Sequence, residues 1–350
     1  MTKKQVFYFN FLTNPKAFEE TLTQDGDVEL SKLTHDMQDT DIDAVLGRAH
    51  GYQIRGNWRD VPDDYRGHAA LIERCPNLLA ISTGGAGYDT IHVDDCTAAG
   101  VLAVNQAGMN AEAVAEHAVG MMLSLTKKIA QVNQALRRDR EWVRRDYMNN
   151  DIYGKTLGVV GLGQIGARVA EICRLAFGMR ILAVHPRLTA EQAAERGAEL
   201  VSFESALEQS DFVLVACGLN EETRGMFGTE AFARMKSTAY FITIGRGGIH
   251  DEAALADALT EGQLAGAGLD VWIEEPPPLD HPLLKFDNVF ASPHIAAITP
   301  ESALKAMTEA ANQWRLILSG RRPPRLANPE AWPSFKDRYK RIMGKPVLED

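Results

Sequence analysis

Two hydrophobic periods alternate along most of the chain. Short apolar runs, typical of buried parallel strands, are separated by segments in which apolar residues recur every three or four positions, as in amphipathic helices. Beyond residue 150 the predicted strands are 157–160, 180–184, 199–203, 212–217, 240–245, 265–271 and 289–292. The predicted helices there begin near 165 and continue with 189–196, 204–209, 229–235, 252–261 and 300–318. This alternation predicts an α/β fold with a doubly wound parallel sheet.

The first 105 residues repeat the alternation on a smaller scale, so we expect a small α/β domain there. Its predicted strands are 5–9, 42–46, 78–82 and 101–105, and helical periodicity is seen at 68–74. The third strand leads into the loop Ser82-Thr83-Gly84-Gly85-Ala86-Gly87-Tyr88-Asp89. Glycines at the carboxyl end of a strand favour close approach of a ligand to the backbone, although a flexible turn would have the same composition.

A glycine motif lies at the start of the larger α/β segment. The run 157–160 leads directly into Gly161-Leu162-Gly163-Gln164-Ile165-Gly166, and a helical pattern and a further strand follow. In this context Gly161 permits a tight turn, Gly163 lets a pyrophosphate approach the backbone, and Gly166 lets helix and strand pack closely. Gln164 and Ile165 open the helix, whose N-terminal N–H groups attract phosphate. The motif predicts a dinucleotide site.

A long helical pattern begins at Asn110. Its apolar face consists of Ala113, Val114, Ala118, Met121, Met122 and Leu125. We interpret His117 within it as a packing or interface residue rather than a ligand. The helix is expected to continue through the arginine-rich segment 134–145, where Trp142 suggests an arm that packs on a partner subunit. A solvated charged face is the common alternative for such a run.

Arg246, Glu275 and His294 each follow a different predicted strand. Loops at the carboxyl ends of such strands bind ligands. A guanidinium can hold a carboxylate with two hydrogen bonds, and a histidine stabilised by a carboxylate can protonate a carbonyl oxygen as hydride arrives. The set therefore suits hydride transfer to a 2-keto acid, whereas each residue taken singly could be structural.

Composition narrows the class of protein. The 350 residues carry a net charge of −10, which argues against nucleic-acid binding. No apolar run is long enough to span a membrane, and the N-terminal run 5–9 is too short for a signal sequence. The four cysteines are scattered, so neither a disulfide framework nor a metal site is indicated. We expect a cytoplasmic protein with reduced thiols.

The chain resembles the D-isomer-specific 2-hydroxyacid dehydrogenase family between about Ile81 and Gly320. Six motifs occur in the family's order, which is far more specific than the glycine motif alone. They are Gly84–Asp89, Asn110–His117, Leu157–Gly166, Phe241–Glu252, Gly266–Pro276 and Ser292-Pro293-His294.

The resemblance implies a domain organisation. A dinucleotide-binding Rossmann domain at 106–295 would be inserted into a flavodoxin-like substrate domain formed by 1–105 and 296–350. The long helix and arm would build a homodimer, as is usual in the family.

The resemblance also implies roles for individual residues. Arg246 would orient the substrate, His294 would be the general acid–base, and Glu275 would be its partner. The backbone of Ala86 and Gly87 would help to hold the substrate carboxylate. Asp270 would meet the nicotinamide carboxamide.

Two segments depart from the family's pattern. Members that prefer NAD usually carry an acidic residue where this chain has His185, and Arg187 follows two residues later. An acid there binds the ribose 2′-hydroxyl, whereas a cation can pair with the 2′-phosphate of NADP. We therefore expect NADP to be preferred over NAD, unless Arg187 points into solvent. Cys217 lies where the family more often has His-x-Pro-Leu-Thr, and its segment is still expected to cover the cofactor.

The resemblance implies an NADP- or NAD-dependent oxidoreductase that interconverts a small anionic 2-keto acid and a D-2-hydroxy acid. An NADP preference would favour reduction of the keto acid, because NADPH pools are generally kept reduced. A glyoxylate or hydroxypyruvate reductase is therefore favoured. A 3-phosphoglycerate dehydrogenase is the main alternative within the class, since Arg48, Arg55, Arg59 and the Arg137–Arg145 cluster are candidates to bind a phosphate. Glu275 weighs against a formate enzyme, which has glutamine there, and a phosphite enzyme stays open. A dinucleotide-sensing corepressor-like protein would keep the same three residues.

Overall fold

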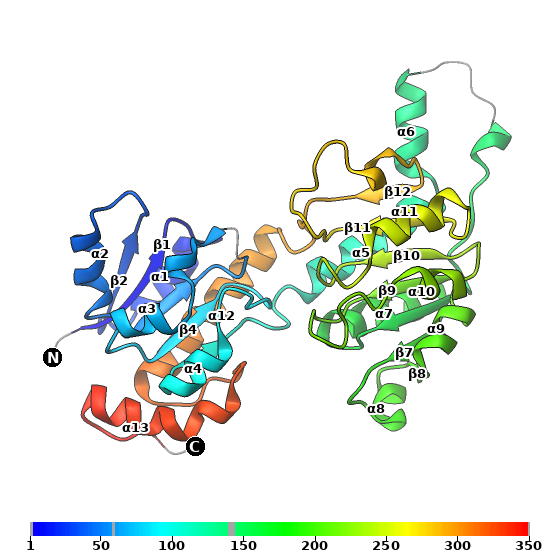
Figure 1. Ribbon diagram of the computed structural model, residues 1–350. Coiled ribbons are helices and arrows are strands. Elements are labelled where there is room, and N and C mark those ends of the chain that lie inside the picture. The colour runs from blue at the N-terminus through cyan, green and yellow to red at the C-terminus, as the bar shows by residue number, and fades with distance from the viewer. Residues whose placement is uncertain (1–2, 58–59, 139–143, 349–350) are drawn as a thin grey trace. The chain divides into compact units, whose positions relative to one another are not determined.

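The computed structural model describes residues 3–57, 60–138 and 144–348 (Figure 1). The chain divides into two compact units. Unit 1 comprises Met1–Asn110 and Thr299–Asp350, and unit 2 comprises Ala111–Ile298. The second unit is thus inserted into the first, and the chain passes between them twice.

Unit 1 is built on a five-stranded parallel sheet with the order β2-β1-β3-β4-β5. Its strands are β1 (Lys4–Phe9), β2 (Val28–Leu33), β3 (Gly51–Ile54), β4 (Ala80–Thr83) and β5 (Leu102–Val104). This is the strand order of flavodoxin-like doubly wound folds, so the predicted fold class is confirmed for this unit.

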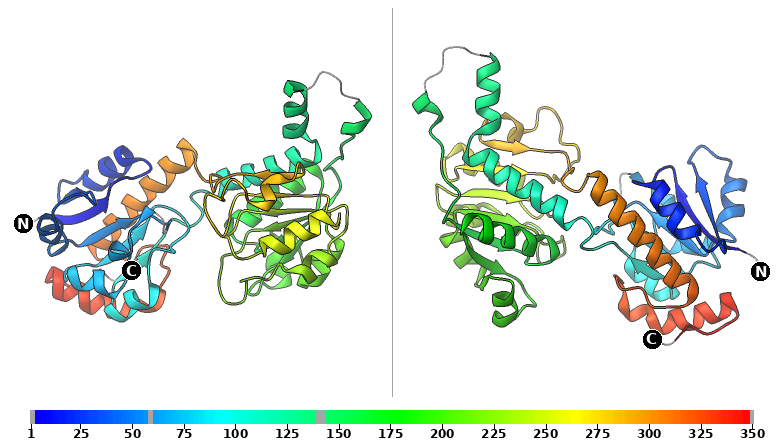
Figure 2. Two further views of the ribbon diagram at one scale, coloured as in Figure 1. Left: turned by 45° about the horizontal axis from the view of Figure 1, so that its top comes forward. Right: turned by 180° about the vertical axis from the view of Figure 1, so that it is seen from behind.

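Helices cover both faces of this sheet (Figure 2). On one face lie α1 (Pro15–Thr23), α12 (Pro300–Ser319) and α13 (Trp332–Met343), in a core that includes Trp314 and Phe335. On the other lie α2 (Asp39–Leu46), α3 (Ala69–Arg74) and α4 (Val93–Ala99). The short helices η2 (Asp63–Tyr65) and η5 (Pro329–Ala331) complete the unit. The C-terminal segment therefore packs within unit 1, where Arg338 of α13 donates hydrogen bonds to the carbonyls of Leu78 and Ala99.

The prediction of a strand at 42–46 is wrong, because this segment lies in α2. Ile42 and Leu46 are one helical turn apart and both are fully buried, which suits a helix that packs on a sheet. Asp39 and Asp41 occupy the first turn, where negative charge complements the helix dipole.

Two strands of unit 1, β2 and β3, were not predicted. Strand β2 is buried only at its ends, Val28 and Leu33, so its pattern is weak. Strand β3 packs against Trp314 of α12, a residue that is distant in sequence. A Cβ atom on Gly51 would lie 2.4 Å from the Trp314 ring, and the Trp314 indole Nε1 donates to Gln53 Oε1 at 2.7 Å.

Unit 2 contains a seven-stranded parallel sheet with the order β12-β11-β10-β9-β6-β7-β8. Its strands are β6 (Thr156–Val160), β7 (Arg180–Val184), β8 (Glu199–Leu200), β9 (Phe212–Val215), β10 (Tyr240–Thr243), β11 (Gly266–Leu269) and β12 (Val289–Ala291). The order reverses between β6 and β9, and doubly wound sheets bind ligands at such a switch point. The prediction of a doubly wound parallel sheet is confirmed.

Helices also cover both faces of the unit 2 sheet (Figure 2). On one face lie α5 (Ala111–Thr126), α7 (Gln164–Phe177) and α8 (Ala190–Glu195). On the other lie α9 (Phe203–Gln209), α10 (Thr229–Arg234) and α11 (Glu252–Thr260), around a cluster of buried phenylalanines. The short helix η4 (Pro282–Lys285) precedes β12. Within the described parts of the chain, none of the helices has the length and apolar character needed to cross a bilayer.

The prediction of one continuous helix from Asn110 to 145 is wrong. Helix α5 ends at Thr126, and α6 (Ile129–Arg138) begins after Lys128, whose φ of +51° is incompatible with a continuing helix. The Thr126 carbonyl accepts a hydrogen bond from Asn150 N at 3.0 Å instead of serving a further helical turn. Figure 1 shows α6 projecting from unit 2, followed by η3 (Arg144–Tyr147). Trp142, proposed as part of an arm, lies outside the described residues.

Candidate functional site

The glycine turn follows β6 at the switch point of the unit 2 sheet. Gly161 has a φ of +100°, and a Cβ atom there would lie 2.6 Å from Cys217 N. A Cβ atom on Gly166 would lie 2.1 Å from Gly161 O. Both glycines are therefore required by the packing of the chain itself. Gly163 differs, because a Cβ atom there meets no atom of the described residues within 4 Å. Its open side is available to a ligand.

Helix α7 starts at this turn. Gly163 is its N-cap residue and makes no side-chain capping bond, and no acidic residue lies in its first turn. Gln164 is exposed, whereas Ile165 packs against the unit 2 core. The first N–H groups and the positive end of a 14-residue helix are suited to bind phosphate.

Basic side chains gather beyond the end of β7. His185 Nδ1 accepts a hydrogen bond from Arg187 N at 3.2 Å. Burial, and then the charges of Arg187 and Arg196, lower the pKa of His185. Arg196, at the end of α8, also donates a hydrogen bond to the carbonyl of Leu162 in the glycine turn. The structure thus adds Arg196, which no sequence motif singles out, to the predicted pair of His185 and Arg187.

Cys217 lies just beyond β9, on the other side of the switch point. Its backbone packs against the glycine turn at Gly161 and against the end of β10, where a Cβ atom on Gly245 would lie 2.6 Å from Cys217 O. Burial raises the pKa of its thiol to about 11. The thiol is therefore protonated near neutral pH and serves as a small, half-buried side chain.

The loops after β10 and β11 are in direct contact. A Cβ atom on Gly247 would lie 1.9 Å from Trp272 O, so only glycine allows the two backbones to approach this closely. Arg246 precedes this contact, and its Nη1 donates to Gly245 O at 2.9 Å. The close approach brings Arg246 near Glu275, whose titration it influences.

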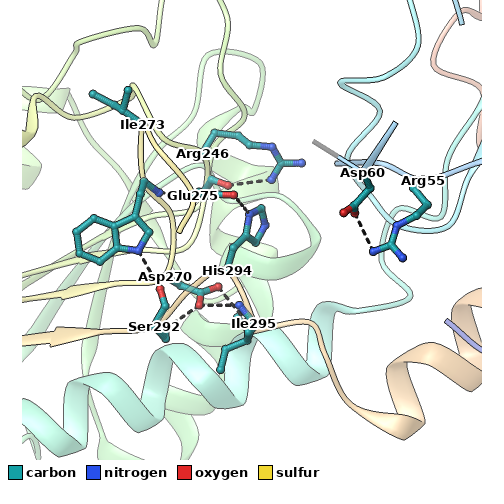
Figure 3. A network of polar contacts seen from close by, with 12 residues as sticks. Arg55, Asp60, Arg246, Asp270, Ile273, Glu275, Ser292, His294 and Ile295 are labelled. Carbon is teal, nitrogen blue, oxygen red and sulfur yellow. Dashed lines mark hydrogen bonds and ion pairs between the residues drawn. The ribbon is translucent and has the colours of Figure 1, made fainter. Parts of the chain in front are cut away.

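Glu275 and His294 form an ion-pair contact, with 2.8 Å between Oε2 and Nδ1 (Figure 3). The other oxygen, Oε1, accepts a hydrogen bond from Trp272 N at 3.1 Å. Burial raises the pKa of Glu275, but His294, Trp272 N and the charge of Arg246 outweigh it, and the net effect is a lowered pKa. Glu275 is therefore a carboxylate that orients the ring of His294 through Nδ1. The Nε2 atom makes no hydrogen bond to the described residues and is available for proton transfer.

Asp270, at the end of β11, holds the loop that carries His294 (Figure 3). Its backbone carbonyl accepts from His294 N at 2.7 Å. Its carboxylate accepts from Ser292 Oγ at 2.7 Å, Ile295 N at 2.9 Å and Ala296 N at 3.1 Å. The residue is only 1% exposed. Asp270 therefore anchors this loop, a role that the sequence did not indicate.

Further residues fix the same loops. Trp272 Nε1 donates to Ser292 O at 2.9 Å. Glu252 accepts from Ile273 N at 2.8 Å and contacts His281 Nε2 at 3.2 Å. Ser292, Trp272 and Glu252 fall inside the motifs of the family, so a signal was present, but their partners cannot be deduced from spacing.

The predicted substrate loop lies in unit 1, after β4. Ala86 O accepts from Asn105 Nδ2 at 3.2 Å, and Gly85 O accepts from Gln106 N at 2.7 Å. Within the described part of the chain, the N–H groups of Ala86 and Gly87 make no hydrogen bond. The carbonyls thus fix the loop while these two donors are left for an anion.

Comparisons with known proteins identify relatives of the chain. Residues 119–296 match the family model for the D-isomer specific 2-hydroxyacid dehydrogenase, NAD binding domain. The chain is 41% identical to a D-3-phosphoglycerate dehydrogenase of Archaeoglobus fulgidus over 67% of this chain and 44% of that protein. It is 37% identical to a glyoxylate reductase of Korarchaeum cryptofilum over 75% of this chain and 80% of that protein.

A solved structure also resembles this one. The 2-hydroxyacid dehydrogenase from Ketogulonicigenium vulgare superimposes with a TM-score of 0.78 and 25% identity, covering 93% of this chain and 99% of that chain. The chain spans about half the length of the D-3-phosphoglycerate dehydrogenases that it matches.

Gly163→Ala is expected to weaken dinucleotide binding by about tenfold or more, because its Cβ atom would occupy the open side of the turn. The free energy of unfolding should change by less than about 1 kcal/mol. Gly166→Ala should instead cost about 2 kcal/mol or more, because the new Cβ atom would collide with Gly161 O. Calorimetric titration with NADPH and thermal unfolding measure the two effects. Unchanged affinity in Gly163→Ala would exclude this turn as the pyrophosphate site.

Proposed function

The chain belongs to the D-isomer specific 2-hydroxyacid dehydrogenase family, and we propose that it interconverts a small 2-keto acid and a D-2-hydroxy acid by hydride transfer. The observation that carries this proposal is the 2.8 Å contact between His294 and Glu275 beside the loop of Arg246. It supplies a proton donor, its charge partner and an anion-binding group on one sheet edge. The glycine turn lies on the same sheet, which supports unit 2 as the dinucleotide-binding domain.

The side chains of the site suit this reaction. The nicotinamide cofactor, when bound, supplies the hydride to the carbonyl carbon of the keto acid. Arg246 would hold the substrate carboxylate and stabilise the carbonyl oxygen as it gains negative charge. His294 would deliver the proton from Nε2 to that oxygen, while Glu275 stabilises the protonated ring through Nδ1. In the reverse direction neutral His294 would accept the hydroxyl proton.

Other predicted residues take supporting roles in this proposal. The N–H groups of Ala86 and Gly87 in unit 1 would help Arg246 to hold the substrate carboxylate. Asp270 would contact the nicotinamide carboxamide. Cys217 would line the cofactor site as a neutral side chain.

The substrate is proposed to be a small, unphosphorylated keto acid such as glyoxylate or hydroxypyruvate. A phosphate would need an uncompensated cation at the carboxyl edge of the unit 1 sheet. Arg55 lies at that edge, but it pairs with Asp60 at 2.8 Å and covers the Phe11 ring at 4.9 Å. Arg48 precedes β3 and so lies at the opposite edge, and Arg59 is outside the described residues. Of the Arg137–Arg145 cluster, Arg137 and Arg138 lie at the end of α6 in unit 2. The names of the phosphoglycerate dehydrogenase relatives keep that substrate as the alternative.

NADP is proposed as the preferred dinucleotide. Two guanidinium groups, Arg187 and Arg196, act on His185, where NAD-preferring relatives usually have an acid. A 2′-phosphate could accept charge-assisted hydrogen bonds from both. The reduced state of NADPH pools then favours reduction of the keto acid.

A homodimer in the cytoplasm is the proposed state of the protein. Helix α6 has no buried residue, and Ile129 and Leu136 on it are 55% and 49% exposed. Met148 and Tyr153 nearby in sequence are both 75% exposed. A second copy would cover these apolar groups. The four free thiols agree with a reducing compartment.

His294→Ala is expected to lower kcat by about 10³-fold without loss of dinucleotide binding, because only the proton donor is removed. Glu275→Gln should lower kcat by about tenfold or more, because the His294 ring loses the carboxylate that orients it through Nδ1. The assay follows NADPH and NADH oxidation with glyoxylate, hydroxypyruvate, pyruvate, phenylpyruvate and 3-phosphohydroxypyruvate. His92→Ala, in an exposed position of unit 1, is the control. Silence with every acid, with dinucleotide still bound, would favour a dinucleotide-sensing corepressor-like role.

Arg187→Gln and Arg196→Gln are each expected to lower kcat/KM for NADPH by about tenfold, and the efficiency with NADH should not fall. The 2′-phosphate contact exists only with NADPH, which accounts for the difference. Arg180→Gln is the matched control, since Arg180 begins β7 and pairs with Glu199 at 2.6 Å. If the native protein used NADH as well as NADPH, the preference would be refuted.

Light scattering of the native protein is expected to give about twice the mass of one chain, because a partner would cover the apolar side of α6. Ile129→Lys combined with Leu136→Lys should shift the protein toward monomer. Leu175→Lys, at a 65% exposed leucine of α7, is the control for added charge. A monomeric native mass would contradict the dimer.

A further inference from the structure

His294 has an unusual backbone conformation for a residue that must be placed accurately. Its φ is +56°, in the left-handed region that non-glycine residues seldom adopt. This conformation costs on the order of 1 kcal/mol or more and persists only where surrounding contacts impose it. The loop of His294 therefore depends on its anchors.

The principal anchor of the His294 loop is the Asp270 carboxylate, and the Ser292 hydroxyl is one of its hydrogen-bond donors. Ser292 Oγ lies 2.7 Å from Asp270 Oδ1 and 2.9 Å from His117 Nε2. Both oxygens of Asp270 act as acceptors here, Oδ1 from the Ile295 N–H group and Oδ2 from the Ala296 N–H group. The single hydroxyl proton of Ser292 must then point to Asp270. The Ser292 oxygen accepts a hydrogen bond from His117, whose proton is on Nε2.

This chain of donors runs in one direction, from His117 to Ser292 to Asp270. His117 is on α5, 175 residues before Ser292 in the sequence. Its Nε2 also lies 3.7 Å from Asp270 Oδ1, close enough to interact with the same carboxylate. The His117 side chain is 23% exposed and that of Asp270 is 2% exposed, so the link is shielded from water along most of its length.

We propose that His117 and Ser292 are positioning residues for His294: the hydrogen bond from His117 fixes the Ser292 hydroxyl, which fixes the Asp270 carboxylate and through it the catalytic loop. The inference rests on the proposed function, since it assigns a role within the same site. His117 does not reach the reacting atoms in this account. Its contribution is to keep Nε2 of His294 where proton transfer requires it.

The test compares two replacements of His117. Leucine retains the bulk of the ring but has no donor, whereas glutamine places an amide N–H close to the position of the histidine Nε2. We expect His117→Leu and Ser292→Ala to lower kcat by about tenfold to a hundredfold, the range expected for a displaced catalytic group. The KM for NADPH should change less than kcat, because the glycine turn and its arginines are untouched and only the nicotinamide end lies near Asp270. His117→Gln should recover most of the lost kcat.

Additivity tests whether the two residues act through one link. The double variant His117→Leu/Ser292→Ala should be no slower than Ser292→Ala alone, because both changes break the same chain of hydrogen bonds. Glu116→Gln, an exposed neighbour on α5, is the matched control and should retain native kcat. Equal kcat for the leucine and glutamine variants, or additive losses in the double variant, would overturn the proposal.

Hydrogen exchange at the Ile295 and Ala296 amides provides a readout that needs no substrate. Both amides bond to the Asp270 carboxylate, so their exchange should quicken by about tenfold or more in His117→Leu and stay near native in His117→Gln. A native protein that turns over no keto acid would refute the proposed function alone. Native exchange rates in His117→Leu would refute the positioning role, whichever substrate is used.

Discussion

The buried carboxylate of Asp270 is the interaction on which the geometry of the unit 2 site depends. A polar side chain that is 1% exposed is costly to bury unless its oxygens accept hydrogen bonds, and here a hydroxyl and two backbone N–H groups donate to them. The same residue supplies the carbonyl that bonds His294 N. Because β11 lies between β10 and β12, Asp270 ties the loop of His294 to the middle of this part of the sheet edge. Hydrogen bonds to a residue with almost no exposure to water thereby hold the left-handed backbone of His294.

Parallel strand pairing brings the other participants to the same edge. Arg246, Glu275 and His294 follow three neighbouring strands, so their loops emerge side by side although they are far apart in sequence. Because Gly247 has no side chain, the loops after β10 and β11 can come into contact. Glu275, whose pKa is lowered, then holds the imidazole ring of His294. The three side chains are thus brought together because the backbones of their loops lie close to one another.

A corresponding arrangement of buried amides fixes the loop after β4 in unit 1. Gln106 is fully buried and donates from Nε2 to Ser82 Oγ and Thr83 O, both at 3.2 Å. Gln313 of α12 donates to Gln106 Oε1 at 2.8 Å. The second crossing of the chain thus supplies a helix that stabilises a loop near the first crossing. Both units use buried polar groups to hold backbone that would otherwise be free to move.

The doubly wound architecture, the glycine turn and the three residues at successive strand ends could be predicted from the sequence, because local periodicity and short motifs indicate them. Prediction from the sequence was wrong at two places. The spacing of Ile42 and Leu46 suits a helix as well as a strand, and the helical period of apolar residues does not indicate the break at Lys128. Three contacts are visible only in the folded chain: Arg196 bonds the glycine turn, Trp314 bonds Gln53 of β3, and His117 bonds Ser292. These contacts join residues from 34 to 261 positions apart, and periodicity carries no information about which distant side chain satisfies a given buried polar group.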